Sequence, residues 1–497
     1  MTSRYAAAMA GIGFLGACIG LAVPSAQASH EVPGFTAHSP ALVAAMTTPR
    51  VVAHMNELQW IADRNDSHRA AGSSGYAASL NYVRRKLEEA GYRTVTQTFT
   101  FPFFEERRPP VFQLTAPVRR NFVPGKDVAT VQFSGAGRLS GRLVPVDLQI
   151  PPGKGGSTSG CESADFPSPG PAPAVALIQR GTCSFSDKVS NARAAGYEAV
   201  VIFNDGRPGS TDLLMGSLDA PSPLPVLGTT YSLGRELASL AEKGAVVRLD
   251  VTTRSEERKT ANLLAETSSG DPGRVVMVGA HLDSVEEGPG INDNASGSAA
   301  ILELAIQMAR QDIRPRNRVR FAWWGAEEAG LYGSKHHVAT LTPGQAKAIM
   351  VYLNFDMIAS HNFVWHIQEG DPKSRADALV EQVLASYFKR ARLPHATIEA
   401  FGNSDYAPFM EIGIPIGGLF SGASDMKTPR EAASYGGTAG QAQDACYHKA
   451  CDTNRFINRR SVRVLSKAIA DTTYRFAMTA RDLRSAGMSG SGTSVRD

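Results

Sequence analysis

The feature that most constrains the fold is a series of short, nearly continuous apolar runs in the second half of the chain. Such runs are typical of strands buried on both faces, because helices cover both sides of a mainly parallel sheet. Helical patterns separate them, at Asn294 to Arg310 and at Ala376 to Arg390. The sequence therefore predicts an α/β fold with a mainly parallel central sheet and helices on both faces. The runs are Val275 to Ala280, Val319 to Trp324, Met350 to Asp356 and Ile414 to Phe420.

An earlier stretch of the chain has the same α/β character. Apolar residues recur at helical spacing from Tyr76 to Ala90, Gly91 follows as a helix stop, and Thr94 to Phe101 has the pattern of a strand. We therefore assign residues 29–129 to the N-terminal part of the domain whose main part is residues 256–482. A chain of 497 residues is long enough for two or more units.

The segment between these parts, residues 130–255, differs in composition. Short apolar runs alternate there with Pro/Gly-rich stretches, such as Pro151 to Gly156 and Pro167 to Pro173. A strand, an R-G-x-C-x-F turn and a helix–strand unit follow one another, an order that resembles a protease-associated (PA) domain. We therefore expect an inserted, β-rich PA domain; a role in packing alone fits the pattern as well as a role in recruiting substrate. The turn residues are Arg180, Gly181, Cys183 and Phe185.

Residues 1–28 have the pattern of a signal peptide. Arg4 supplies a positive start, an apolar stretch runs from Tyr5 to Val23, and an A-x-A site ends at Ala28. An uncleaved anchor and a lipoprotein attached at Cys18 are the alternatives, and the apolar run that continues past Cys18 favours ordinary secretion. No later segment is long and apolar enough to span a bilayer. We expect a secreted protein with no stable membrane association, and a disordered Gly/Ser-rich tail at 483–497.

Composition argues against two classes of partner. The formal net charge is only +4 and no dense run of Lys and Arg occurs, so nothing supports binding to nucleic acid or to an anionic membrane.

The cysteines agree with export. Outside the predicted signal peptide four remain, and four cysteines allow three pairings. Proximity favours Cys161 with Cys183 and Cys446 with Cys451, each closing a short loop in an oxidising compartment. Metal binding is the weaker interpretation, because no C-x-x-C pair is present.

Several potential metal ligands follow the predicted strands directly. In open α/β sheets, ligand sites gather at the carboxyl ends of strands. Taken singly, each of these residues is consistent with a solvated loop residue. Their shared position relative to the strands is what indicates a site. They are His281, Glu327 with Glu328, Asp356, and Asp293 in the loop after His281.

Two local patterns strengthen this hypothesis. Asp283 stands two residues after His281, where a carboxylate can fix the tautomer of a metal-bound imidazole. Small residues from Gly290 to Gly297 allow the backbone to bend tightly around Asp293, and a helix beginning near Asn294 would place its positive end nearby. A carboxylate in that position can bridge two cations.

The order of these residues resembles the M28 family of zinc aminopeptidases, and within it the secreted, leucine-type enzymes of actinobacteria. The pattern is H-x-D, G-x-x-D-N-x-S-G, W-x-x-E-E-x-G-L-x-G-S, N-x-D-M and Y-H, and it covers most of residues 256–480. The resemblance implies two zinc ions. It assigns His281 and Asp356 to one ion, Glu328 and His448 to the other, and Asp293 to both.

The resemblance also implies the catalytic groups. Glu327 would be the general base and Tyr447 would donate a hydrogen bond to the oxyanion. Cys446 and Cys451 would staple the loop that carries Tyr447 and His448. Two imidazoles and three carboxylates suit zinc, and paired ions can activate water and polarise a carbonyl. Nothing in the sequence supports a calcium site.

Each piece also has a plainer interpretation. Glu327 and Glu328 could be an acidic helix start, Tyr447 a packed aromatic, and the Cys446–Cys451 pair purely stabilising. Adjacent residues on an extended segment point in opposite directions, so one glutamate can face the metals while the other faces water.

The expected substrate is the free N-terminus of a peptide, with an apolar first residue. Residues 402–409 resemble a family segment that often carries Arg where Asn403 stands, so Asn403 is a candidate for substrate contact. An M28 carboxypeptidase or dipeptidase, a glutaminyl cyclase and a non-catalytic receptor with a PA domain are alternatives, and the full ligand set disfavours the last two. Pocket lining and core packing are both open for Phe401, Phe409, Ile412, Leu419 and Phe420.

Overall fold

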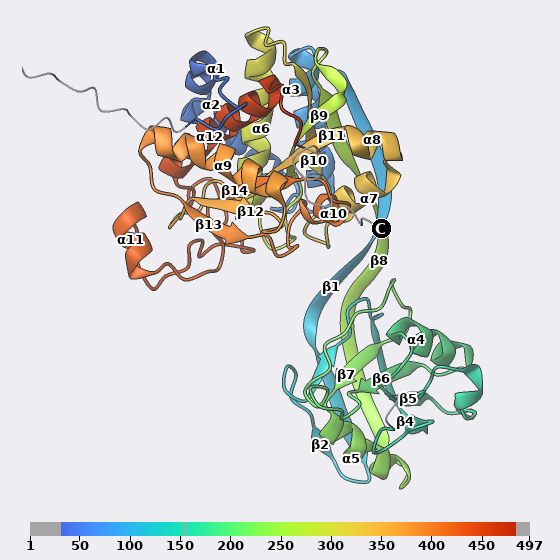
Figure 1. Cartoon of the computed structure of the whole chain (residues 1–497). Coiled ribbons are helices and arrows are strands. Elements are labelled where there is room, and N and C mark those ends of the chain that lie inside the picture. The colour runs from blue at the N-terminus through green and yellow to red at the C-terminus, as the bar shows by residue number, and fades with distance from the viewer. Residues whose placement is uncertain (1–30, 154–155, 484–497) are drawn as a thin grey trace, which may run out of the picture.

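The structure is a computed structural model that describes residues 31–153 and 156–483. It has two lobes joined by a neck of two long strands, β1 and β8 (Figure 1). The predicted signal peptide at 1–28, with Cys18, and all but the first residue of the predicted tail at 483–497 lie outside the described residues.

The neck is one antiparallel ribbon. Strand β1 (Thr94–Ala116) pairs with β8 (Val246–Glu266) from Thr94 opposite Ala265 to Ala116 opposite Val246, with irregularities in register between Glu106 and Val111 and near Ala116. The N-terminal part of β1 and the C-terminal part of β8 belong to the larger lobe, and their other ends belong to the smaller lobe (Figure 1).

The sheet of the larger lobe is parallel at its centre. Its strands lie in the order β13, β12, β14, β11, β9, β10, β8, with β1 beyond β8. Strands β14, β11, β9 and β10 run parallel, whereas β8 and β12 are antiparallel to their inner neighbours. The predicted mainly parallel sheet is confirmed. The strands are β9 (Asp271–His281), β10 (Asn317–Trp324), β11 (Ile349–Phe355), β12 (His366–Glu369), β13 (Ala396–Glu399) and β14 (Ile416–Phe420).

Helices cover both faces of this sheet, which explains the nearly continuous apolar runs. In β9, Val276 and Val278 face one core, while Val275 and Met277 face the other, so neither face can be polar. The first core is covered by α1 (Pro40–Ala45), α2 (Thr48–Asp63), α3 (Ser74–Glu89), α6 (Gly297–Arg310), α9 (Arg375–Ala391) and α12 (Arg459–Met478). The second is covered by α7 (Tyr332–Thr340), α8 (Pro343–Ala348) and α10 (Ala407–Glu411), while α11 (Pro429–Tyr435) lies at the periphery (Figure 1).

The smaller lobe is a second α/β unit. Strands β4, β5, β6 and β7 are parallel, β8 and β3 add antiparallel edges, and α4 and α5 pack against two separate cores. The predicted pair Cys161–Cys183 is a disulfide. Its elements are β2 (Arg120–Asn121), β3 (Val128–Thr130), β4 (Gly137–Val146), a short 3₁₀ turn (Ser163–Asp165), β5 (Ala174–Gln179), α4 (Phe185–Ala194), β6 (Ala199–Phe203), β7 (Val226–Thr229) and α5 (Tyr231–Ala241).

The chain passes between the lobes inside uninterrupted strands. Phe112, Leu114 and Phe122 already pack in a core of the smaller lobe, before residue 130, and β8 runs through residue 255. At the crossing the apolar alternation is lost, since Glu105 to Arg108 of β1 and Arg254 to Glu257 of β8 are charged or polar and exposed or half-buried. The division at 129/130 and 255/256 stays a prediction.

Candidate metal centre

The predicted ligands converge at the carboxyl edge of the central strands. Strand β9 lies between β10 and β11, so the residues that follow these three strands are neighbours in space. His281 ends β9, Glu327 and Glu328 lie in the turn after β10, and Asp356 follows β11. Asp293 lies in the irregular turn Ile291–Ser296 before α6, and His448 lies in the loop after α11.

Asp293 stands between the two histidines. Its Oδ1 lies 3.1 Å from Nε2 of His281, and its Oδ2 lies 3.1 Å from Nε2 of His448. A carboxylate that turns one oxygen to each imidazole has the arrangement of a bridging ligand.

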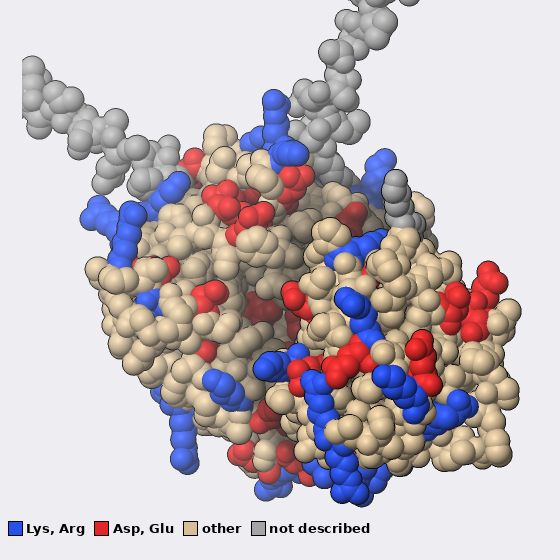
Figure 2. All heavy atoms as spheres, turned by 90° about the horizontal axis from the view of Figure 1, so that it is seen from below, with Lys and Arg blue, Asp and Glu red and all other residues tan. Residues whose placement is uncertain are grey.

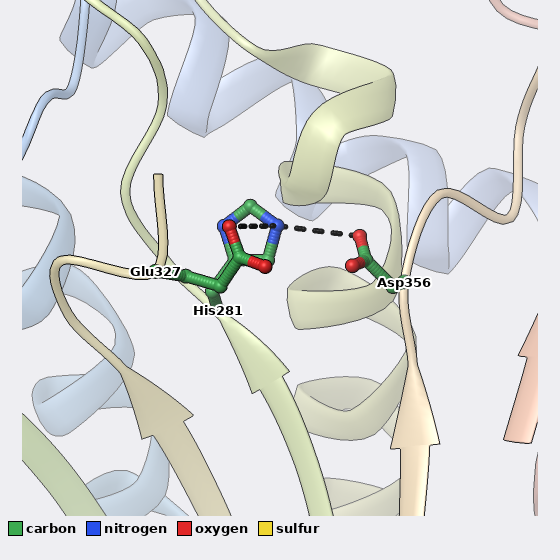
Figure 3. Close-up of side chains that lie close together, drawn as sticks. All are labelled: His281, Glu327 and Asp356. Carbon is green, nitrogen blue, oxygen red and sulfur yellow. Dashed lines mark hydrogen bonds and ion pairs between the residues drawn. The ribbon is translucent and has the colours of Figure 1, made fainter. Parts of the chain in front are cut away.

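Each histidine has a further carboxylate of its own. Asp356 Oδ1 lies 3.2 Å from His281 Nε2, and Glu327 Oε2 lies 4.0 Å from the same nitrogen (Figure 3). Glu328 Oε2 lies 3.0 Å from His448 Nε2. Two groups of donor atoms compact enough for a cation therefore share His281, one with Glu327 and Asp356, the other with Asp293 and Glu328.

The donor set fits zinc. Neutral imidazole and carboxylate are ordinary zinc ligands, and all the candidates except His448 have side chains at most 13% exposed. Glu328 Oε1 is buried without a hydrogen-bond partner among the described residues, which is costly for a carboxylate oxygen that no cation compensates.

Several carboxyl groups of the centre are buried close to one another, and their pKa values are shifted as a result. Burial raises the pKa of Glu327 well above its usual range, and Asp405 and Asp356 push it the same way. Burial alone would raise the pKa of Asp293, but hydrogen bonds from His281 and His448 hold it below its usual value. Several carboxylates in so little water need positive charge nearby, which divalent cations supply.

Asp283 acts differently from the sequence-based expectation. His281 Nδ1 lies 3.2 Å from the backbone oxygen of Asp283, whereas the Asp283 carboxylate is 3.6 Å away. The two carboxylate oxygens accept the backbone N–H groups of Glu327 and Glu328 instead, at 3.3 Å each. Asp283 thus fixes the imidazole through its carbonyl and the glutamate turn through its side chain.

Glu327 and Glu328 lie in a turn, not in the extended segment expected from the sequence. The N–H of Gly330 donates to the backbone oxygen of Glu327 at 2.8 Å, and the backbone of Ala326 lies in the left-handed region with φ +58°. Both side chains reach the centre from this turn, Glu327 beside His281 and Glu328 beside His448.

A cavity of about 360 Å³ opens over the ligands. Its charged lining in the described chain contains carboxylates and His448 but no Lys or Arg, and Tyr447 lies in its wall. Figure 2 shows acidic side chains inside a hollow on the face seen from below. Asn403 lines the cavity too, and its Oδ1 accepts the hydroxyl of Tyr406 at 2.5 Å.

The aromatic candidates divide between cavity and core. Phe401 and Phe420 line the cavity, together with Ile398 and Met357. Phe409 and Leu419 are fully buried in the two cores. Ile412 is half-exposed and is not among the lining residues.

Sequence reasoning missed several supporting residues. Ser404 Oγ donates to Asp356 Oδ2 at 2.7 Å. Arg69, fully buried, donates to the backbone oxygens of Leu282, Pro289 and Gly290. Ser404 falls inside a segment already singled out, but no local pattern marks Arg69.

The loop that carries Tyr447 and His448 is closed by the predicted Cys446–Cys451 disulfide. The loop is short, so the disulfide restricts where Tyr447 and His448 can lie relative to the cavity.

Comparisons with known proteins agree with this geometry. The model of Peptidase family M28 matches residues 262–473 and the PA domain model matches residues 139–237. An aminopeptidase of Pseudomonas aeruginosa is 43% identical over 433 residues, which is 85% of this chain and 80% of that protein. The chain belongs to peptidase family M28.

Two further relatives cover similar lengths. Leucine aminopeptidase 2 of Trichophyton equinum is 35% identical over 445 residues, covering 87% of this chain and 84% of that protein. The probable lipoprotein aminopeptidase LpqL of Mycobacterium tuberculosis is 34% identical over 458 residues, covering 88% and 86%.

The fold also matches a solved structure. The aminopeptidase from Aneurinibacillus sp. strain AM-1 aligns with a TM-score of 0.62 at 23% identity, over 89% of this chain and 97% of that one. The predictions of an M28 peptidase, of a PA domain and of the fold class are confirmed. Within residues 31–153 and 156–483, no helix has the length and apolarity needed to cross a membrane.

Proposed function

We propose that this M28 peptidase is a zinc aminopeptidase that removes single residues from the N-termini of peptides. The observation that carries the proposal is the placement of Asp293, with one oxygen 3.1 Å from each histidine of the centre. The family membership and the aminopeptidase names of the relatives support it.

The proposed ligand assignment uses two zinc ions. His281 and Asp356 would hold one, Glu328 and His448 would hold the other, and Asp293 would serve both. Zinc bound there would lower the pKa of a bound water to about 7 and polarise the carbonyl of the scissile bond.

The chain's own groups perform the proton transfers and hold the substrate. Glu327, beside His281 and on the cavity wall, accepts the proton of the attacking water and returns it to the leaving amine. The Tyr447 hydroxyl donates a hydrogen bond to the carbonyl oxygen as negative charge develops on it. Asn403, which lines the same cavity, is the proposed polar contact to the substrate.

An apolar first residue fits the cavity. Ile398, Phe401 and Phe420 contribute apolar surface to its lining, and carboxylates contribute negative charge. A cavity lined by both suits a substrate with an apolar side chain and a protonated α-amine. The name of the Trichophyton relative, a leucine aminopeptidase, supports this preference.

We further propose that residues 130–255 form the inserted segment of the PA domain, to whose core β1 adds Phe112 and Leu114, and that the protein is secreted after cleavage behind Ala28. The relative named as a lipoprotein makes acylation at Cys18 the alternative to test. Mass spectrometry of the exported protein distinguishes the two outcomes, because secretion predicts Ser29 as the first residue and acylation predicts a lipid-bearing Cys18.

The test of the activity uses the purified chain and a panel of amino acid p-nitroanilides, with and without a zinc chelator. We expect hydrolysis of Leu-p-nitroanilide, its loss with the chelator and its recovery with zinc. N-acetylated Leu-p-nitroanilide should resist cleavage, since an aminopeptidase needs the free amine. Cleavage of the acetylated substrate, or release of C-terminal residues from peptides, would overturn the assignment, and no zinc-dependent cleavage at all would indicate a receptor.

A further inference from the structure

The bridging carboxylate and the second histidine come from segments far apart in the chain. Asp293 lies in the turn before α6, and His448 lies in the disulfide-closed loop after α11. Asp293 Oδ2 and His448 Nε2 nevertheless lie 3.1 Å apart. Some contact must therefore fix the turn against the loop. The side chains of Asp293 and His448 alone do not hold the two segments together.

Asp452, the residue after Cys451 in the chain, makes that contact. Its Oδ1 accepts the backbone N–H of Asn292 at 2.7 Å and its Oδ2 accepts the N–H of Asp293 at 3.0 Å. Its backbone oxygen accepts the N–H of Ile291 at 3.2 Å. Three consecutive N–H groups of the ligand-bearing turn thus donate to one residue that is 3% exposed.

Asp444 holds the other end of the same loop. Its Oδ1 accepts the N–H of Cys446 at 2.8 Å, and its Oδ2 accepts the side-chain amide of Asn292 at 2.5 Å. Asp444 and Asp452 therefore flank the Cys446–Cys451 disulfide on both sides, and each binds the turn of Asp293.

The backbone on the His448 side of this contact is in an uncommon conformation. His448 takes the left-handed region with φ +55°, whereas Asp293 and Asn294 have non-helical angles with negative φ. A left-handed conformation at a residue other than glycine persists when surrounding contacts over-determine it. The packing is also close, since a Cβ on Gly288 would lie 2.3 Å from the Lys449 oxygen.

We propose that Asp452, assisted by Asp444, is a positioning residue that holds the bridging ligand Asp293 in register with His448. It touches neither substrate nor metal and acts by binding the backbone that carries Asp293. The inference rests on the proposed function, in which Asp293 and His448 share a zinc ion. Partners of this kind change metal affinity by roughly 10–100-fold when they are lost.

The test compares full-length variants carrying the same isosteric change. Asp452→Asn replaces one acceptor by an N–H₂ group that faces a backbone N–H. Asp377→Asn is the matched control: Asp377 is also buried, and its Oδ1 accepts the N–H of Ile416 at 2.7 Å at the start of β14, the end remote from the centre. Zinc affinity is measured by competition with a chromophoric chelator, alongside thermal unfolding and kcat at saturating zinc.

We expect Asp452→Asn to weaken zinc binding roughly 10–100-fold. It should also lower kcat at saturating zinc, with little change in KM. Asp377→Asn should bind zinc like the unaltered protein even if its unfolding temperature falls equally. Asp444→Asn, which removes one acceptor from the same connection, should show a smaller loss of affinity and carries the test if Asp452→Asn does not fold.

Unchanged zinc affinity and kcat in both flanking variants would overturn the inference, as would an equal loss in Asp377→Asn. If the unaltered protein binds zinc tightly but cleaves no aminoacyl substrate, the proposed function fails, while the affinity comparison still decides the role of Asp452.

Discussion

The ring of Tyr447 lies against the imidazole of its chain neighbour His448, with ring centroids 3.8 Å apart and planes inclined by 28°. The stacking places the tyrosine in the wall of the cavity next to a proposed zinc ligand. Since the ring itself packs, removal of the hydroxyl alone separates a chemical role from a packing role.

Tyr447→Phe should lower kcat by roughly tenfold or more, approaching the effect of losing one oxyanion donor. Zinc content should not change, because the ring that packs on His448 remains. Steady-state kinetics with Leu-p-nitroanilide check this. Tyr435→Phe, a buried tyrosine that packs on Trp365 away from the cavity, is the control and should leave kcat unaltered. A normal kcat in Tyr447→Phe would remove the hydroxyl from the mechanism.

The neighbouring glutamates should respond in opposite ways to the same substitution. Glu327→Ala should lower kcat by roughly 10²–10⁴-fold and keep its zinc, because it removes a proton acceptor. Glu328→Ala should lose zinc, since it removes a carboxylate 3.0 Å from His448 Nε2. Metal analysis after gel filtration, paired with kinetics, checks both. Zinc loss from Glu327→Ala would mean that the two roles are misassigned.

The two disulfides provide another matched pair. Replacing Cys446 and Cys451 together by Ser frees the loop that carries Tyr447 and His448, so zinc affinity and kcat should both fall by about tenfold or more, within the range for lost supporting contacts. Replacing Cys161 and Cys183 frees a loop of the smaller lobe only. That variant should keep zinc affinity and hydrolysis of Leu-p-nitroanilide. Equal losses in the two double variants would show a general effect on folding.

His337 should make stability depend on pH below neutrality. Burial lowers its pKa to about 3, with Arg320 and His336 adding to the effect, while its Nδ1 bonds Gln97 at 2.9 Å. Between about pH 6.5 and 3 the unfolded chain binds a proton here that the folded chain does not. The free energy of unfolding should therefore fall as the pH falls, by up to about 1.4 kcal/mol per pH unit.

Urea unfolding at pH 7.5 and pH 5 measures this effect. His337→Gln keeps a donor for Gln97 but cannot take up the proton. Its free energy of unfolding should therefore fall by about 2 kcal/mol less between the two pH values, because pH 5 lies about 1.5 units below the ordinary pKa of histidine. Other titrating groups cancel in the comparison. Equal pH dependence in the two proteins would contradict the low pKa.

The positions of the strand ends in the larger lobe follow from the sequence. Burial of both faces leaves β9 and β11 as continuous apolar runs, so each strand end is visible where a polar residue follows. His281 and Asp356 stand at those ends, and parallel neighbours bring such residues to one edge. This is why His281 and Asp356 could be predicted as neighbours before any contact was known, whereas His448 was a candidate only through the family resemblance.

The irregular turn before α6 was decided by tertiary structure. Helical periodicity predicted a start near Asn294, but the helix begins at Gly297 because Asp293 and Asn294 take non-helical backbone angles that present the carboxylate. The turn is held by Asp452, from the other end of the domain. Phe409 and Phe420 look alike in the sequence, yet one fills a core and the other lines the cavity.

The sequence by itself determined which segments are buried and which polar residues end them, because burial produces a local, regularly spaced pattern of apolar residues. The tertiary structure decided which of those residues meet and what holds them there. Contacts such as those of Arg69 and Asp452 join segments distant in the chain through backbone groups that every residue possesses. A backbone N–H or carbonyl has no side-chain identity, so such contacts leave no local pattern to read.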